Sequence, residues 1–89
     1  MKELKEIRTE IEQLDGEMAR LFEKRMALAE QVAACKKANG LKVTDRRREQ
    51  ELLDHNEQFI EKAELKSYYQ EFFRKVLSLS RRYQKELLK

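Results

Sequence analysis

The segment ELKEIRTEIEQLDGEMARLFEKRMALAEQVAACKKA, residues 3–38, decides the fold class of this chain. Apolar side chains recur along it at alternating steps of three and four residues, with one interruption, at Leu4, Ile7, Ile11, Leu14, Met18, Leu21, Leu28, Val32 and Cys35. This spacing lines one face of an α-helix, and a stripe of this length is typical of a helix that packs lengthwise against another helix. We therefore predict one long helix over residues 3–38.

Two further helices are predicted downstream. Asn39 and Gly40 tolerate the left-handed conformation that ends helices, and a short loop over 41–44 follows. Thr44 or Asp45 can cap a second helix over 45–60. Its inner side carries Leu52, Leu53, Asn56 and Ile60. A third helix over 65–88 places apolar side chains at helical spacing, at Leu65, Tyr69, Phe72, Phe73, Val76, Leu77, Tyr83 and Leu87. We expect an all-α chain and a single domain over residues 1–89.

The composition argues against several classes of protein. The chain has 89 residues, of which 42% are charged, with two glycines and no proline, and this favours helices over sheets. The formal charge of +3 permits a small anionic ligand but is weak for a nucleic-acid binder. No apolar run reaches the length of a membrane span, and the N-terminus MKELKEIRTE lacks the apolar core of a signal peptide. We expect a cytoplasmic protein that self-associates, because so short a helical chain has few layers with which to bury its apolar stripes.

The chain has one cysteine and one histidine. Cys35 cannot form a disulfide within the chain, and His55 has no neighbours at metal-ligand spacing. We predict that Cys35 is a small buried hydrophobe and that His55 lies on the surface.

Several polar residues occupy positions where the helical pattern calls for core residues. Arg25 interrupts the apolar stripe and Lys36 flanks it, and further polar residues lie on the inner faces of the other two helices, at Asp45, Arg48, Glu49, Ser80 and Gln84. Each alone could be satisfied at a surface or within its helix. Several inward-facing cations need a common partner, however, because buried charges are costly unless they are paired, and Glu49 alone is too few. The sequence thus predicts a bound dianion.

Arg8 adds a constraint on the quaternary structure. It lies 17 residues before Arg25, or about 25 Å along a continuous helix, which no small ligand spans. If Arg8 serves the same kind of site, it must come from a second chain whose first helix runs antiparallel, with the two-fold axis near Ala19. The pattern predicts a homodimer with two symmetry-related sites.

With these residues in place, the chain resembles the all-helical class of chorismate mutases over essentially its full length. The resemblance rests on a spaced set of motifs, LKEIRTEIEQLD, EKRMALAEQVAACKK, TDRRRE and SRRYQ. It implies an intertwined homodimer of three-helix chains that converts chorismate to prephenate on the way to Phe and Tyr. The reaction is a unimolecular Claisen rearrangement, so the resemblance implies no cofactor and no metal.

The resemblance also implies how the substrate is bound. Arg8 from the partner chain, together with Arg25 and Arg48, should hold the two substrate carboxylates, since arginine forks suit bidentate pairing. Ser80 should assist at one carboxylate.

The remaining implied roles concern the reacting atoms and the ring. Lys36 and Gln84 should donate to the ether oxygen, where negative charge grows as the bond breaks. Glu49 and the Asp45 segment should fix the ring hydroxyl. Val32, one turn before Lys36, should form an apolar wall.

Two alternatives remain at the level of the sequence. An isochorismate-pyruvate lyase on the same scaffold would use a similar cationic pocket for an isomeric dianion, although the full set around Glu49 favours the mutase. A non-enzymatic helical module would instead use the arginine runs 46–48 and 81–82 to bind nucleic acid or an acidic partner. The modest net charge argues against this second reading.

Overall fold

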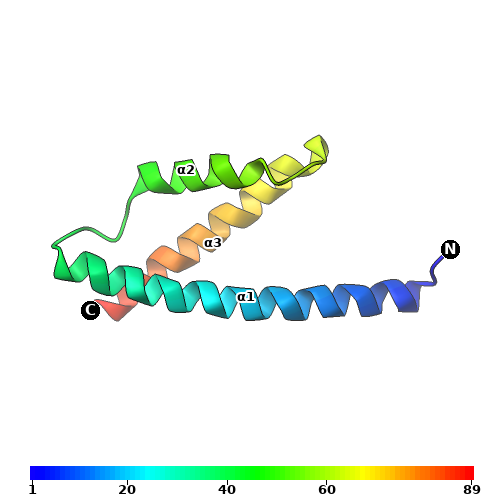
Figure 1. Cartoon of the computed structure of the whole chain (residues 1–89), viewed down its shortest axis with the longest axis horizontal. Coiled ribbons are helices and arrows are strands. Elements are labelled where there is room, and N and C mark those ends of the chain that lie inside the picture. The colour runs from blue at the N-terminus through cyan, green and yellow to red at the C-terminus, as the bar shows by residue number, and fades with distance from the viewer.

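The computed structural model describes all residues, 1–89, and contains three α-helices and no strand. Helix α1 spans Leu4–Ala38, α2 spans Arg46–Glu57 and α3 spans Lys66–Leu87. Figure 1 shows α1 as a long rod, with α3 running obliquely back from the end of α2 and crossing the C-terminal half of α1. The predicted all-α class is confirmed. None of the three helices combines the length and the apolar character needed to cross a membrane.

The ends of α1 follow the sequence signals. Asn39 is the C-terminal cap, and its backbone N–H bonds to the carbonyl of Cys35. Gly40 follows with a φ of 65°, the left-handed conformation that a glycine adopts without steric cost. The predicted helix over 3–38 is confirmed to within one residue at its start.

Helix α2 begins where predicted but ends earlier. The Asp45 carboxylate caps it by accepting a hydrogen bond from the Arg48 backbone N–H at 3.1 Å. The predicted end at Ile60 is wrong, because Glu57 is the last residue of the helix. Residues 58–60 bond to carbonyls three positions back instead of four, a tightening typical of helix termini. A short 3₁₀ turn, Ala63–Leu65, then leads into α3.

The small core lies where α3 meets the other two helices. Leu53 of α2 and Phe73 and Leu77 of α3 form its buried cluster. Ala29 and Ala33 are the buried residues of α1. They are one helical turn apart, and such small side chains let two helix backbones approach closely. Only seven of the 89 residues are buried, which is little for a chain that must fold alone.

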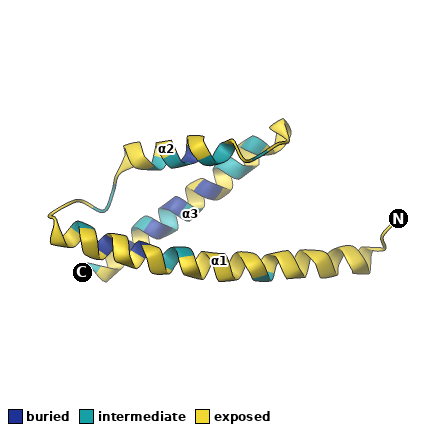
Figure 2. Ribbon diagram, viewed as in Figure 1, coloured by how far each residue is buried: buried dark blue, intermediate teal, exposed yellow.

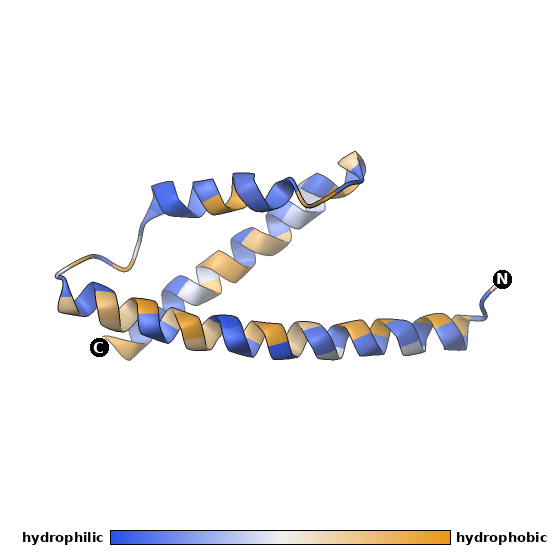
Figure 3. Ribbon diagram, viewed as in Figure 1, coloured by the Kyte–Doolittle hydropathy of each residue, from blue (hydrophilic) through white to orange (hydrophobic).

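The N-terminal half of α1 packs against nothing within the chain. Figure 2 shows it almost entirely exposed, and Figure 3 shows apolar segments recurring along it. The exposed apolar side chains of this half are those of the predicted stripe, at Leu4, Ile7, Ile11, Leu14, Met18 and Leu21. The stripe therefore remains available for a second helix from another chain.

Of the predictions for the single histidine and the single cysteine, the structure confirms the first and contradicts the second. His55 is exposed, as predicted, and its ring lies edge-on to Phe59. The prediction that Cys35 is buried is wrong, since its thiol is exposed in the single chain. Two residues along a helix turn the side chain by about 200°, so Cys35 points away from α3 while Ala33 faces it.

One side-chain contact ties the C-terminal part of α3 to α1. The Tyr83 hydroxyl donates a hydrogen bond to the Glu30 carboxylate. This bond, with desolvation and the charge of the same carboxylate, raises the pKa of Tyr83 above its usual value. The raised pKa therefore extends to more alkaline pH the range in which this hydroxyl, already protonated at neutral pH, can donate.

Candidate active site

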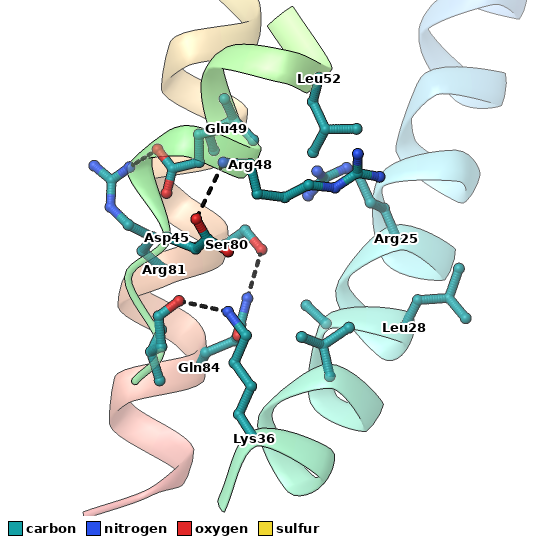
Figure 4. A pocket seen from close by; sticks show the side chains of 14 residues that line it. Arg25, Leu28, Lys36, Asp45, Arg48, Glu49, Leu52, Ser80, Arg81 and Gln84 are labelled. Atoms are coloured by element: carbon teal, nitrogen blue, oxygen red, sulfur yellow. Dashed lines mark hydrogen bonds and ion pairs between the residues drawn. The ribbon is translucent and has the colours of Figure 1, made fainter. Parts of the chain in front are cut away.

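A cavity of about 400 Å³ lies between α1, the start of α2 and the C-terminal half of α3. Figure 4 shows side chains from all three helices converging on it. All eight site residues predicted within one chain line it, namely Arg25, Val32, Lys36, Asp45, Arg48, Glu49, Ser80 and Gln84. The structure brings together residues that are up to 59 positions apart in the chain.

Helix α1 supplies one wall and two cations. Arg25, Val32 and Lys36 share a face with Leu28 and Ala29, because steps of three and four residues return to the same side of a helix. The Arg25 guanidinium carbon lies 5.6 Å from the centre of the Phe73 ring, a favourable cation–π distance. Arg25 forms no ion pair within the chain, which leaves its donors available to an anion.

Lys36 occupies the other end of this wall. Its Nζ donates a hydrogen bond of 2.7 Å to the carbonyl oxygen of Val43, in the loop between α1 and α2. An ammonium group has three N–H donors, so two remain for a ligand in the cavity. The contact also fixes the loop that leads to Asp45 against α1.

The first turn of α2 brings three functional side chains to the cavity. Asp45 is held as the helix cap, which fixes the start of the turn. Arg48 extends from this turn toward Arg25 on the opposite helix (Figure 4). The one ion pair of its guanidinium is with Glu51, which lies 3.6 Å from Nη1 and is half exposed. Two guanidinium groups thus face the same space.

Helix α3 contributes the buried polar pair of the site. Ser80 and Gln84 are one turn apart, and Gln84 Nε2 donates to Ser80 Oγ at 3.2 Å. The amide has a second N–H that this bond does not use. Gln84 Oε1 is a buried acceptor without a hydrogen-bond partner within the chain, whereas the unused N–H on Nε2 is the group that can donate to a ligand.

The charge in the cavity suits a dianion. Four cationic side chains line it, Arg25, Lys36, Arg48 and Arg81, against the two carboxylates of Asp45 and Glu49. Two positive charges remain in excess. A small molecule with two carboxylates would balance them, and the apolar surface of Leu28, Val32, Leu52 and Leu77 would contact its carbon skeleton.

Two residues lie differently from the site as the sequence predicts it. Arg8 does not line the cavity of its own chain and is exposed on the free half of α1. Arg81 does line it, although the sequence analysis gives the arginine pair 81–82 a part only in the non-enzymatic alternative. The available signal was spacing, because Arg81 precedes Gln84 by three residues and so lies on an adjacent part of the same helix face.

Comparison with known protein families identifies the family to which a chain with this cavity belongs. A family model described as chorismate mutase type II matches residues 7–85, which include every residue of the cavity. The chain belongs to the chorismate mutase type II family. It is accordingly an isomerase of a family that binds chorismate. A search of curated proteins found no match.

Membership of the chorismate mutase family excludes one of the two alternative functions that the sequence left open. A non-enzymatic helical module built on the arginine runs is excluded, since the chain is an enzyme. Two members of those runs line the cavity instead, Arg48 from α2 and Arg81 from α3.

Proposed function

We propose that this chain rearranges chorismate to prephenate in the cavity between its three helices, as a step in Phe and Tyr biosynthesis in the cytoplasm. The observation that carries the proposal is the convergence of four cations and several hydrogen-bond donors on one space with an excess of two positive charges, where Arg25 and Lys36 form no ion pair within the chain. Chorismate carries two carboxylates. The rearrangement breaks the ether C–O bond while a C–C bond forms within the same molecule, so it requires no second reactant.

Binding in a compact conformation is the first part of the mechanism. Arg25 and Arg48 lie on opposite sides of the cavity and present guanidinium forks suited to carboxylates. Ser80 adds a hydroxyl on the third helix. Holding both carboxylates brings the two reacting carbons together, and orientation of this kind can account for much of a rate enhancement.

Stabilisation of developing charge is the second part. As the ether bond breaks, negative charge grows on its oxygen, and prepared donors at that point lower the barrier. Lys36 and Gln84 approach the cavity from α1 and α3 and retain unused N–H groups. We assign both as donors to the ether oxygen.

The ring of the substrate requires its own contacts. Glu49 and the Asp45 segment are assigned to the ring hydroxyl, since carboxylate oxygens accept its hydrogen bond. Val32 provides an apolar wall between Arg25 and Lys36. This assignment gives each polar residue that lines the cavity, except Arg81, a place in the reaction.

The complete site requires two chains. The apolar stripe on the N-terminal half of α1 is exposed in the single chain, and burial of such a stripe against the same stripe of a second copy gives a two-fold symmetric dimer. If the two α1 helices run antiparallel about an axis near Ala19, Arg8 of each chain reaches the cavity of the other. We therefore propose an intertwined homodimer with two sites, each completed by Arg8 of the partner subunit.

Product identification tests the proposed activity. The purified protein is incubated separately with chorismate and with isochorismate, and the products are separated by chromatography. We expect saturable conversion of chorismate to prephenate and no release of pyruvate from isochorismate. Pyruvate release from isochorismate without prephenate formation would identify a lyase on this scaffold and contradict the proposal.

A further inference from the structure

The Glu49 carboxylate is held from one side by an arginine of another helix. Arg81 Nη1 lies 2.5 Å from Glu49 Oε1, and the two side chains are only 18% and 16% exposed. Arg46 also approaches Oε1, but at 3.6 Å and with a side chain that is 72% exposed. The part-buried contact to Arg81 is therefore the one that can fix the carboxylate, because exposed ion pairs are weak.

The second oxygen of this carboxylate remains available. Glu49 Oε2 accepts no hydrogen bond within the chain, whereas both arginines are on the side of Oε1. A carboxylate with one oxygen fixed by a charged partner presents the other in a defined direction. Figure 4 shows the Arg81–Glu49 pair at the edge of the site, with Arg81 on the far side of Glu49 from Arg25.

A second cavity explains why such a hold is needed. It has a volume of about 250 Å³, lies between α2 and α3, and is lined by Arg46, Glu49, Gln50, Leu53, Arg74, Leu77 and Arg81. Glu49, Leu77 and Arg81 line both this cavity and the main one. The Glu49 side chain thus has solvent-accessible space on two sides. Without Arg81, the exposed arginines Arg46 and Arg74 would draw its charge toward the second cavity, away from a bound substrate.

We propose that Arg81 is a positioning residue that orients Glu49 toward the substrate. It binds Oε1 and so directs Oε2 at the ring hydroxyl of chorismate. This inference rests on the proposed function, in which Glu49 accepts a hydrogen bond from the ring hydroxyl of chorismate. Arg81 acts through Glu49 and needs no contact with the substrate, since its charge is already paired in a poorly exposed site, where separating two partners is costly.

A double-mutant cycle tests this dependence. Chorismate turnover is measured for the wild type, Arg81→Met, Glu49→Gln and the double variant. We expect Arg81→Met to reduce kcat/KM by about tenfold or more in the wild-type background, as expected when a reacting group is misplaced. In the Glu49→Gln background the same change should cost less than about twofold, because the charge that Arg81 orients is already gone.

Two further variants separate positioning from folding. Arg81→Lys keeps the charge on the same helix and should recover much of the activity that Arg81→Met loses, although an ammonium lacks the guanidinium fork. Arg82→Met is the matched control, since Arg82 is exposed, forms no ion pair and follows Arg81 directly. It should leave kcat/KM unchanged. For variants whose turnover is too slow to assay, the affinity for prephenate, measured by its binding to the protein, takes the place of kcat/KM in the cycle.

The outcomes are distinct. Equal losses from Arg81→Met in both backgrounds would overturn the inference, because Arg81 would then act independently of Glu49. Equal losses of kcat/KM from Arg81→Met and Arg82→Met would overturn it as well, because the loss would then come from a general disturbance of α3 and not from the contact with Glu49. A wild-type protein that does not convert chorismate would instead overturn the proposed function, and the inference with it.

Discussion

Lys36 and Arg25 lie at the two ends of the α1 face that lines the cavity. Each side chain is held by a contact within the chain and still has N–H groups free to donate. Lys36 is held at the Val43 carbonyl and Arg25 over the Phe73 ring. Neither forms an ion pair with an acid of the chain. At the scale of single residues, the account depends on these two cations meeting the substrate at different points, a carboxylate for Arg25 and the ether oxygen for Lys36.

Removal of either cation should nearly abolish catalysis. Lys36→Ala is expected to lower kcat by about a hundredfold or more, the usual effect of losing one donor to developing charge. Arg25→Ala is expected to lower kcat by a similar factor, because the substrate carboxylate is no longer held in the reactive orientation. The measurement is the loss of chorismate absorbance at saturating substrate. Lys37→Ala serves as the control, because Lys37 is the exposed neighbour of Lys36. Rates near that of the wild type for Lys36→Ala would contradict the assignment of the ether-oxygen donor.

Gln84 predicts a simple dependence on pH. An amide donates its N–H at every accessible pH, so turnover should be roughly constant from neutral to mildly alkaline solution. In Gln84→Glu the side chain must be protonated to donate, and its activity should therefore fall as the pH rises from about 5 to 8. A pH profile of kcat for both proteins checks this. A steep alkaline loss in the wild type, with the dimer intact, would argue against Gln84 as donor.

At the scale of elements, α1 is the helix whose packing the single chain leaves incomplete. Its C-terminal half contacts α3 through Ala29 and Ala33, while the apolar stripe of its N-terminal half is exposed. Because few residues are buried in the single chain, the proposed packing of the stripe against a second copy would supply a large share of the burial that stabilises the fold.

A charge in the stripe should separate the two chains. Leu14→Glu is expected to shift the mass in solution from about twice 10.8 kDa to a single chain, and to lower both helicity and chorismate turnover, because a buried charge in a helix interface is unpaired. Light scattering after gel filtration measures the mass. Gln13→Glu introduces the same charge beside the stripe and should keep the dimer. A wild-type protein that is monomeric at micromolar concentration would contradict this account.

The helices differ in how well their limits could be predicted. Local signals set the ends of α1 and the start of α2, namely Gly40 and the Asp45 cap, and these were predicted to within about one residue. The end of α2 has no such signal. Phe59 and Ile60 continue the apolar pattern, yet the chain turns before them toward α3, and Phe59 is exposed. The apolar pattern therefore continues past the last residue of the helix.

The whole molecule explains which parts of the site the sequence could reveal. Polar residues in core positions are visible as breaks in an apolar pattern, and for this reason seven of the cavity residues could be predicted, whereas Val32 was expected only from the family resemblance. Arg81 breaks no pattern, since Ser80 and Gln84 on either side are polar as well. Its importance appears only when α2 and α3 are packed together and Glu49 lies beside it. Cys35 was misjudged for the same reason, because only the packing shows which face of α1 meets α3.

The central claim is that each catalytic site is shared between two chains, with Arg25 from one and Arg8 from the other. Arg8→Ala and Arg25→Ala are each expected to be nearly inactive as pure dimers. When the two variants are mixed in equal amounts and exchange subunits, half of the dimers are mixed, and each mixed dimer has one complete site.

Chorismate turnover of this mixture is the most direct test. Random exchange should restore about a quarter of the wild-type activity per chain, because one of two sites is complete in about half of the dimers. Subunit exchange is verified with differently tagged chains. No recovery of activity after proven exchange, or full activity of the pure Arg8→Ala dimer, would contradict a site shared between two chains.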